Sequence, residues 1–345
     1  MRVAFWLTFT VALILGALYG VGYFLLPNTL DVTRSVSIDR PRAAVFAMAN
    51  DLKIAKEWSP YYARDPDAEY SFSGEGPGSG QAMHWISTNR QVGSGGVTIV
   101  RSTLNREVDT IIQLGDSATF NGRMMIQKTT AGSSAAWTVS AVCQAGWINI
   151  PCRYMNLALS KIIEKDLDDA LARLKTQAQQ LPNVDFEGLA PEFLTVSAQP
   201  FVYSAAQTSA SDQAEVDRAL AMGVDAVRRF MAESAMTPAG PMVRQTTAWN
   251  AADQRMSFNV GYPYSGPTPL TVVNVQIGQT PSGQAMKVVH TGPRETVADT
   301  YAKAFAFLQA HRIALREQGL PWEVVSDGSD GAPASTRIEI YIPLQ

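Results

Sequence analysis

The hydrophobic and polar positions divide the chain into three stretches with different periods. From Val3 to Leu30 no charged residue occurs, and this apolar run has no polar face. Residues 31–180 hold many short apolar–polar alternations separated by glycine-rich turns, which predicts antiparallel strands joined by hairpins. Beyond residue 195 long helical periods are interleaved with strands. The pattern therefore predicts an apolar leading segment followed by two α+β domains.

The leading segment has the properties of a transmembrane helix. It exceeds the roughly 20 apolar residues that cross a bilayer, and no small-x-small cleavage site follows it. Trp6 and Tyr23 stand near its two ends, where aromatic rings suit the membrane interface. Residues 1–30 are predicted to be an uncleaved anchor, with the N-terminus, including Arg2, in the cytoplasm and everything after Asp31 on the other side of the cytoplasmic membrane. A cleaved signal peptide is the competing interpretation.

Residues 31–180 predict one sheet domain that ends in a long helix. The first strand covers Val32–Asp39, Pro41 opens a helix, and a second short helix leads to Trp58. Six further strands are expected around 68–73, 80–87, 94–103, 106–115, 118–129 and 134–143. A helix from about Arg153 to Gln180 then has an apolar stripe at helical spacing, formed by Ile163, Leu167, Ala170, Leu174 and Ala178.

Residues 181–195 contain Pro182, Gly188 and Pro191 and show neither a helical nor a strand period, which predicts a linker. Residues 196–345 then read as two copies of one unit, each a strand, a long helix and two strands. The two helices are expected at about Asp212–Glu233 and Arg294–Glu317. Two prolines of the first copy recur at an offset of 80 residues, as Pro241 with Pro321 and Pro263 with Pro343. The same offset aligns Glu323 with Val243, so the predicted duplication is symmetric in shape and not in charge.

Composition and charge limit the classes of partner that the chain is expected to bind. Hydrophobic residues are 46% of the chain and charged residues 17%, enough apolar material for real cores. The net charge is −3 and no Lys/Arg-rich run occurs, so no nucleic-acid partner is expected. The three histidines, His84, His290 and His311, are too scattered to suggest a metal site. The glycine-rich stretch 74–80 is not followed by a lysine or a helix start, and no cofactor is expected.

Cys143 and Cys152 are the two cysteines of the chain. In an oxidising compartment such a pair can form a disulfide. Two buried free cysteines, acting as small hydrophobic residues, are the alternative. Their spacing does not decide between the two interpretations.

The first domain resembles the START-like, or SRPBCC, superfamily. The resemblance rests on the stretch VSIDRPRAAVFAMANDLKIAKEWSPYY, in which Val45, Phe46, Asp51 and Trp58 occupy the positions typical of the superfamily. The resemblance implies a helix-grip fold in which an apolar cavity between the sheet and the long helix binds hydrophobic molecules. Trp58 and Trp85 are candidate cavity residues; ordinary packing explains them equally well.

The second domain resembles the GyrI-like effector-binding domain. The resemblance is carried by the motif Gln284–Pro293, then Tyr301, Leu320–Glu323 and Ile340–Pro343. It implies two repeats side by side and a cleft between them, with a glutamate at the cleft floor that meets cationic or polar ligands. Glu323 occupies that position. The family usually has an aromatic residue after Gly-Pro, where this chain has Arg294.

Glu323 is the main candidate ligand contact. It shares a strand face with Val325, and a buried carboxylate there would be costly without a purpose. An exposed strand-edge glutamate is the alternative. The strands that would border the cleft supply aromatic residues as candidate walls, each of which also has a packing explanation: Trp322, Tyr341, Tyr262, Trp249 and Tyr203.

The sequence thus favours a membrane-tethered protein that binds small hydrophobic or amphipathic ligands, cationic ones included, and it shows no helix-turn-helix pattern. A hydrolase or cyclase acting on a hydrophobic molecule is the second hypothesis, and a protein-interaction module is the third. No nucleophile–base motif occurs, so no catalytic residue is assigned and binding is favoured over catalysis. A carboxylate and a tyrosine in one pocket leave hydrolysis open.

Overall fold

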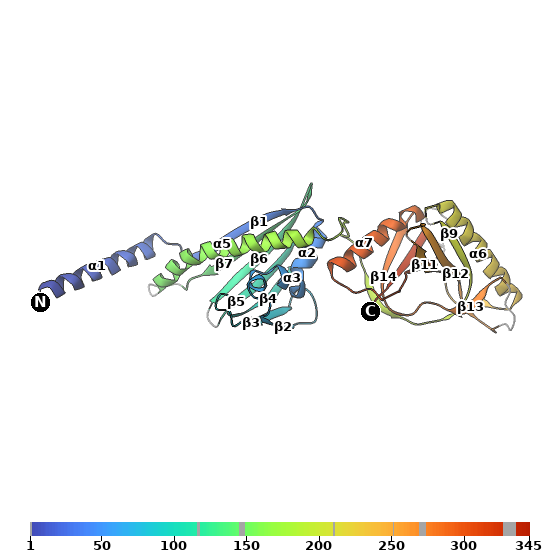
Figure 1. The fold of residues 1–345 in the computed structure, drawn as a ribbon, viewed down its shortest axis with the longest axis horizontal. Coiled ribbons are helices and arrows are strands. Elements are labelled where there is room, and N and C mark those ends of the chain that lie inside the picture. The colour runs from blue at the N-terminus through green and yellow to red at the C-terminus, as the bar shows by residue number, and fades with distance from the viewer. Residues whose placement is uncertain are drawn as a thin grey trace. The chain divides into compact units, whose positions relative to one another are not determined.

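The structure is a computed structural model that describes residues 2–115, 118–144, 149–209, 211–250, 252–268, 274–326 and 336–345. It divides into two compact units, Met1–Glu187 and Gly188–Gln345, each of which is described by itself (Figure 1). Both units combine helices with an antiparallel sheet. The α+β class predicted from the sequence is confirmed.

The chain begins with helix α1, Arg2–Phe24. Of the helices in the described ranges, one segment, Phe5–Phe24, is long and apolar enough to cross a membrane. The C-terminal end of α1 is held by Arg153, whose Nη1 donates to the carbonyls of Gly22 at 3.2 Å and Tyr23 at 2.8 Å. The last carbonyls of a helix lack partners within it, so this arginine satisfies them and complements the helix dipole.

The first unit continues with one strand, three short helices, six strands and a long helix. Their bounds are β1 Thr29–Ile38, α2 Arg42–Asn50, α3 Leu52–Trp58, α4 Pro60–Arg64, β2 Glu69–Ser73, β3 Ala82–Ile86, β4 Ser94–Thr103, β5 Glu107–Leu114, β6 Ala118–Thr129, β7 Gly132–Val142 and α5 Ile150–Ala178. The sheet order is β1-β7-β6-β5-β4-β3-β2. The predicted element order is confirmed, with α4 added as a separate short helix after Trp58.

Local capping explains the break between α3 and α4. The Asp51 side chain accepts from the Lys53 amide at 2.9 Å and begins α3, and the Ser59 hydroxyl accepts from the Tyr61 amide at 3.2 Å and begins α4. The predicted stripe of α5 is buried at its central positions, Leu167, Ala170, Leu174 and Ala178. The helix therefore packs its apolar face on the sheet, and Figure 1 shows α5 lying along this sheet.

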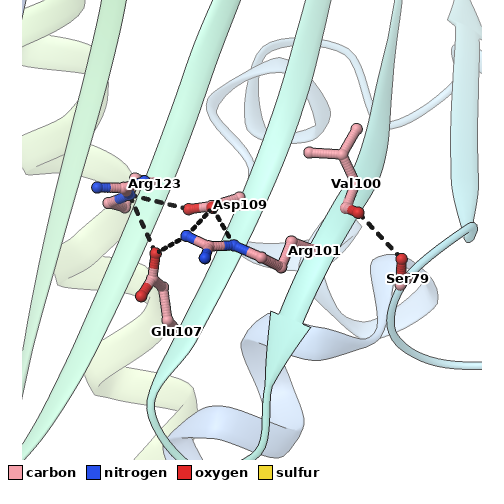
Figure 2. A network of polar contacts seen from close by, with 6 residues as sticks. All are labelled: Ser79, Val100, Arg101, Glu107, Asp109 and Arg123. Carbon is pink, nitrogen blue, oxygen red and sulfur yellow. Dashed lines mark hydrogen bonds and ion pairs between the residues drawn. The ribbon is translucent and has the colours of Figure 1, made fainter.

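Acidic and basic side chains alternate across the other face of this sheet (Figure 2). Arg101 on β4 contacts Glu107 at 2.7 Å, and Arg123 on β6 contacts Asp109 at 3.0 Å. Burial opposes ionisation of Asp109, but hydrogen bonds from both arginines outweigh it and lower the pKa of this carboxyl. Both arginines are largely exposed, so the network adds little stability and mainly marks this face as the solvated one.

A disulfide joins Cys143, after β7, to Cys152 in the first turn of α5. The Cα atoms are 6.0 Å apart, and Asn156 donates to the Cys143 sulfur at 3.2 Å. Of the two interpretations left open by the sequence, the structure has the bridge. It fixes the start of the long helix to the end of the sheet.

The second unit has its strands and helices in the order β8 Glu192–Val196, β9 Pro200–Ser209, α6 Gln213–Glu233, β10 Thr237–Pro238, β11 Met242–Asn250, β12 Arg255–Ser265, β13 Gln276–Gln279, β14 Gly283–Gly292, the 3₁₀ turn η2 Arg294–Thr296, α7 Val297–Ala310, β15 Trp322–Ser326 and β16 Thr336–Pro343. The main sheet order is β13-β9-β12-β11-β15-β16-β14-β8, with β10 beside β12. The element order β-α-β-β occurs twice, as β9-α6-β11-β12 and β14-α7-β15-β16.

Two boundaries differ from the sequence prediction. Residues 192–195 of the expected linker belong to β8, which pairs with β14 at the end of the sheet; a short edge strand is stabilised by that partner and has no strong period of its own. The helix expected to reach Glu317 ends at Ala310, because Arg312 takes a left-handed conformation with φ of 52°.

Both helices of this unit cover the same face of the sheet. From α6, Val227 and Met231 pack on Tyr262, and from α7, Ala304 and Leu308 pack on Val325. The segments β9-α6-β11-β12 and β14-α7-β15-β16 meet where β11 pairs with β15. This central strand pair therefore lies beneath the space between α6 and α7.

Candidate ligand-binding site

The alternation of β15 decides which side chains reach the helix-covered face. Glu323 and Val325 point to that face, and Trp322 and Val324 belong to the cluster on the opposite one. Residues directly opposite in an antiparallel pair share a face, and Arg244 on β11 is opposite Glu323. Glu323 is 1% exposed, so the interpretation as an exposed edge glutamate is wrong.

The buried carboxylate of Glu323 is compensated by specific partners. Arg244 Nη2 donates to its Oε1, and the Tyr301 hydroxyl donates to the same oxygen at 3.1 Å. Arg294 approaches the other oxygen, with 3.7 Å between Nη2 and Oε2. A buried charge is tolerated when it is paired and hydrogen-bonded, which these contacts provide.

Two atoms of this cluster keep hydrogen-bonding capacity. Glu323 Oε2 and Arg294 Nη2 are both buried, and neither has a hydrogen-bond partner within the described residues. Their separation of 3.7 Å is longer than a normal hydrogen bond. Buried polar atoms are nearly always satisfied, so this donor and this acceptor are incompletely compensated within the described residues.

The cluster forms part of the wall of a cavity of about 570 Å³ between α6 and α7. This volume lies in the range of small-molecule pockets, about 300–1,000 Å³. Its charged residues include Glu323, which is buried, and Arg244 and Arg294, which are half-buried. Its apolar lining comes from both helices, from the central strands and from the loop before β15, and includes Val216, Trp249, Met256, Val297, Phe305 and Leu320.

A bulge in β11 brings Trp249 to this cavity. Arg244 and Thr246 lie on the cavity side, and strict alternation would continue with Ala248. The register between β11 and β12 shifts between Thr246 and Ala248, so Trp249 takes that side and pairs with Met256. The indole is 53% exposed, which places it at the cavity mouth.

The remaining predicted wall residues lie elsewhere, so the expectation of a single aromatic cleft needs correction. Trp322 and Tyr341 stack with centroids 5.1 Å apart and line a smaller cavity of about 250 Å³ on the opposite face of the sheet. Tyr203 stacks on Phe201 near them and donates to Gln276 at 2.9 Å. The period of two along a strand places these rings away from Glu323.

Tyr262 lies on the helix-covered face but does not line the 570 Å³ cavity. It packs against α6, and its hydroxyl accepts from Arg228 Nε at 3.1 Å. Its role in the described structure is packing. The aromatic candidate of this unit that the structure brings to the Glu323 cavity is therefore Trp249.

Burial and neighbouring charges shift two groups of the site. Burial raises the pKa of Tyr301 well above its usual value, and the negative charge of Glu323 raises it further. Tyr301 is therefore a neutral donor at physiological pH. The pKa of Arg294 is lowered, first by burial and then by the like charge of Arg244, against the attraction of Glu323 and Asp217.

The first unit has a smaller cavity of about 100 Å³ between its sheet and α5. Trp58 lines it and meets Trp137 edge-on, with centroids 5.5 Å apart. Trp85 is fully buried against Tyr61 and is outside the lining, so its role is core packing. This volume is below that of pockets for drug-sized ligands, and the second unit holds the better candidate site.

Sequence reasoning did not assign Arg244 and Tyr301 to the site. Tyr301 was named only within the motif of the GyrI-like resemblance, which does not reveal the contact of its hydroxyl with Glu323. A charged residue, Arg244, and a polar one, Thr246, share one face of a central strand, and this was the signal in the sequence that could have assigned Arg244 to the site.

His290 has a structural role. Its two ring nitrogens contact the Thr300 hydroxyl at 2.8 Å and the Pro293 carbonyl at 3.1 Å, and so shape the turn before α7. In the described ranges no cluster of three His, Cys, Asp or Glu residues is placed to hold a metal ion.

Comparison with known proteins finds a family model that matches the second unit. Residues 189–345 match the family model described as GyrI-like small molecule binding domain. No curated protein matches the chain. Among solved structures, the EcmrR C-terminal domain is 14% identical, with a TM-score of 0.39, and the match covers 46% of this chain and 98% of that one.

Two further solved structures are similar at low identity. An EcmrR–DNA complex matches at 15% identity and a TM-score of 0.40, over 57% of this chain and 72% of that one. The SA2116 protein from Staphylococcus aureus matches at 10% identity and a TM-score of 0.35, over 44% of this chain and 97% of that one. The family match begins three residues before β8, so this edge strand belongs to the domain. Residues 189–345 of this chain are thus similar to GyrI-like small-molecule-binding domains.

Proposed function

We propose that the chain binds a small amphipathic molecule in the cavity between α6 and α7, with its polar end at the Glu323 cluster. The observation that carries this proposal is the unsatisfied pair at that cluster, Glu323 Oε2 and Arg294 Nη2, beside an apolar wall of suitable size. An amphipathic molecule satisfies both features, because its apolar body is removed from water and its polar end meets the leftover hydrogen-bonding atoms.

Binding is favoured over catalysis by the contacts of the carboxylate. Glu323 Oε1 already accepts from Arg244 and Tyr301, so this oxygen is held by partners within the protein. Tyr301 holds its proton strongly because burial and Glu323 both raise its pKa. These groups suit a fixed recognition surface for a ligand.

We further propose that α1 anchors the chain in the cytoplasmic membrane, with the remaining chain on the non-cytoplasmic side. The apolar segment Phe5–Phe24 and the disulfide Cys143–Cys152 both support this location. The first unit is proposed to be a helix-grip domain of the START-like type, and the second a duplicated β-α-β-β unit, on the element orders described above.

The binding proposal is tested by blocking the cavity. Ala298 lines it from α7, and Ala302 on the same helix is exposed and outside the lining. We expect calorimetric titration of the full chain with the neutral probe 2-naphthamide to show binding that Ala298→Trp abolishes and Ala302→Trp preserves. Equal binding by both variants contradicts the proposed site.

A further inference from the structure

The buried charges around the cavity do not cancel. The side chain of Arg244 is 13% exposed and that of Arg294 is 24% exposed, against a single buried carboxylate, Glu323, that is 1% exposed. Tyr301 contributes no charge, since its raised pKa keeps it protonated. The buried part of the site therefore carries two positive charges and one negative charge.

Two acidic residues lie nearer to solvent and compensate less of the positive charge of the two arginines. Asp217 is 54% exposed, and its Oδ1 lies 4.0 Å from Arg294 Nε. Glu295 lines the cavity and is exposed. Water and salt screen exposed charges far more than buried ones, so these carboxylates do not offset the inner positive charge fully.

The contacts show which arginine holds the surplus charge. Glu323 Oε1 is bound by Arg244, so these two residues form the primary ion pair. Arg294 is 3.7 Å from the second oxygen, and its buried Nη2 has no hydrogen-bond partner within the described residues. Arg294 thus lines the cavity with a side chain that interacts only weakly with the carboxylate.

The environment of Arg294 also favours an additional negative charge. Burial lowers its pKa, and the like charge of Arg244 lowers it again, and together these exceed the attraction from Glu323 and Asp217. An anion near Nη2 would satisfy the donor and relieve this unfavourable balance. A cation in the same place would be repelled by the net positive charge, and this repulsion is strong because the space is partly desolvated.

We infer that the cavity selects anionic amphipathic molecules, with a carboxylate or sulfonate group at Arg294 and an aromatic or aliphatic body against Trp249, Met256 and Phe305. This inference rests on the proposed function and specifies its ligand class. It reverses the preference for cations that the position of Glu323 alone implies, because in this chain Arg244 neutralises that glutamate and Arg294 adds a second cation.

Three probes with one ring system and different charges test the inference: 2-naphthoate, 2-naphthamide and 2-naphthylmethylammonium. In calorimetric titrations of the full chain, we expect 2-naphthoate to bind about tenfold more tightly than 2-naphthamide, as for a charge-assisted hydrogen bond at a partly exposed site. The ammonium probe should bind most weakly. Arg294→Gln should abolish the advantage of 2-naphthoate over 2-naphthamide.

Arg218→Gln is the matched control, because Arg218 is an exposed arginine of α6 outside the cavity lining. It should keep the wild-type order of affinities. Arg294→Lys, which retains the charge, should keep a preference for 2-naphthoate and provides the comparison if Arg294→Gln does not fold. Unfolding temperatures of all variants are measured in parallel.

The outcomes separate this inference from the proposed function. Equal affinities of the three probes for the wild-type chain, or tightest binding of the ammonium probe, overturn anion selection and leave the cavity as the binding site. The same conclusion follows if Arg294→Gln and Arg218→Gln keep the same preference. Failure of all three probes to bind, or binding unaffected by Ala298→Trp, overturns both proposals.

Discussion

Glu323 and Arg244 are the closest ionic partners at the centre of the second sheet. Their pairing explains how a carboxylate is accommodated in an apolar strand, since the charge is compensated by a residue on the neighbouring strand. It also means that neutralising Glu323 leaves Arg244 buried with a weaker partner. Removal of one member of a buried pair is costly for this reason.

Glu323→Gln should therefore destabilise the protein by about 1–3 kcal/mol, the cost of an incompletely satisfied buried group. Replacement of both partners, with Glu323→Leu and Arg244→Met, should recover most of that loss. The measurement is a double-mutant cycle from denaturant unfolding of the full chain. A Glu323→Gln variant as stable as the wild type would show that the carboxylate is not a structural partner of Arg244.

Tyr301 gives the site a dependence on alkaline pH. Because its pKa is raised in the folded state, the folded protein keeps a proton that the unfolded chain loses above about pH 10. The stabilisation from Tyr301 is thus complete below about pH 10 and is lost as the pH rises through its higher folded-state pKa. Tyr301→Phe does not ionise, so the stability advantage of the wild type should be constant from pH 7 to 9 and should shrink above pH 10. Unfolding midpoints across this range provide the test, and a difference that does not vary with pH argues against the assigned environment.

The face of a strand on which a side chain lies could be predicted from sequence where it depends only on the alternation within that strand. The shared face of Glu323 and Val325 follows from the period of two, and the structure has it. Arg244 was missed because its contact depends on the register between strands about 80 residues apart. The face of Trp249 depends on a bulge that simple alternation does not indicate.

At the scale of elements, hydrophobic periodicity was sufficient for the first unit. The six strands after α4 and the stripe of α5 follow from local patterns. In the second unit, β8 exists as the partner of β14, and α7 stops where Arg312 turns left-handed. Both features depend on tertiary context, so the sequence extended the linker and the helix too far.

The disulfide between β7 and α5 is an element-scale stabiliser. It closes a loop with a sequence separation of 9, for which the chain-entropy model gives about 2–3 kcal/mol. Cys143→Ser with Cys152→Ser should lose about that amount in denaturant unfolding. Peptide mapping without reduction should recover the linked pair from protein folded in an oxidising compartment. Two free thiols in that protein would contradict the bridge.

At the scale of the whole molecule, the proposed anchor determines where ligands are met. A reporter enzyme that is active only outside the cytoplasm, fused after Gln345, should be active. Deletion of residues 1–30 should release the chain from membranes. Activity of a cytoplasm-only reporter at the same junction argues against the orientation, and a mature chain beginning near Pro27 indicates a cleaved signal peptide.

The claim that organises the whole chain is that its ligand site lies in the GyrI-like domain, over the β11–β15 strand pair. The most direct measurement is an experimental structure of the full chain with 2-naphthoate. We expect the ring of 2-naphthoate between α6 and α7, against Trp249 and Phe305, with its carboxylate at Arg294. A probe bound beside Trp58 in the first unit, or beside Trp322 and Tyr341 on the opposite face of the second sheet, would contradict it.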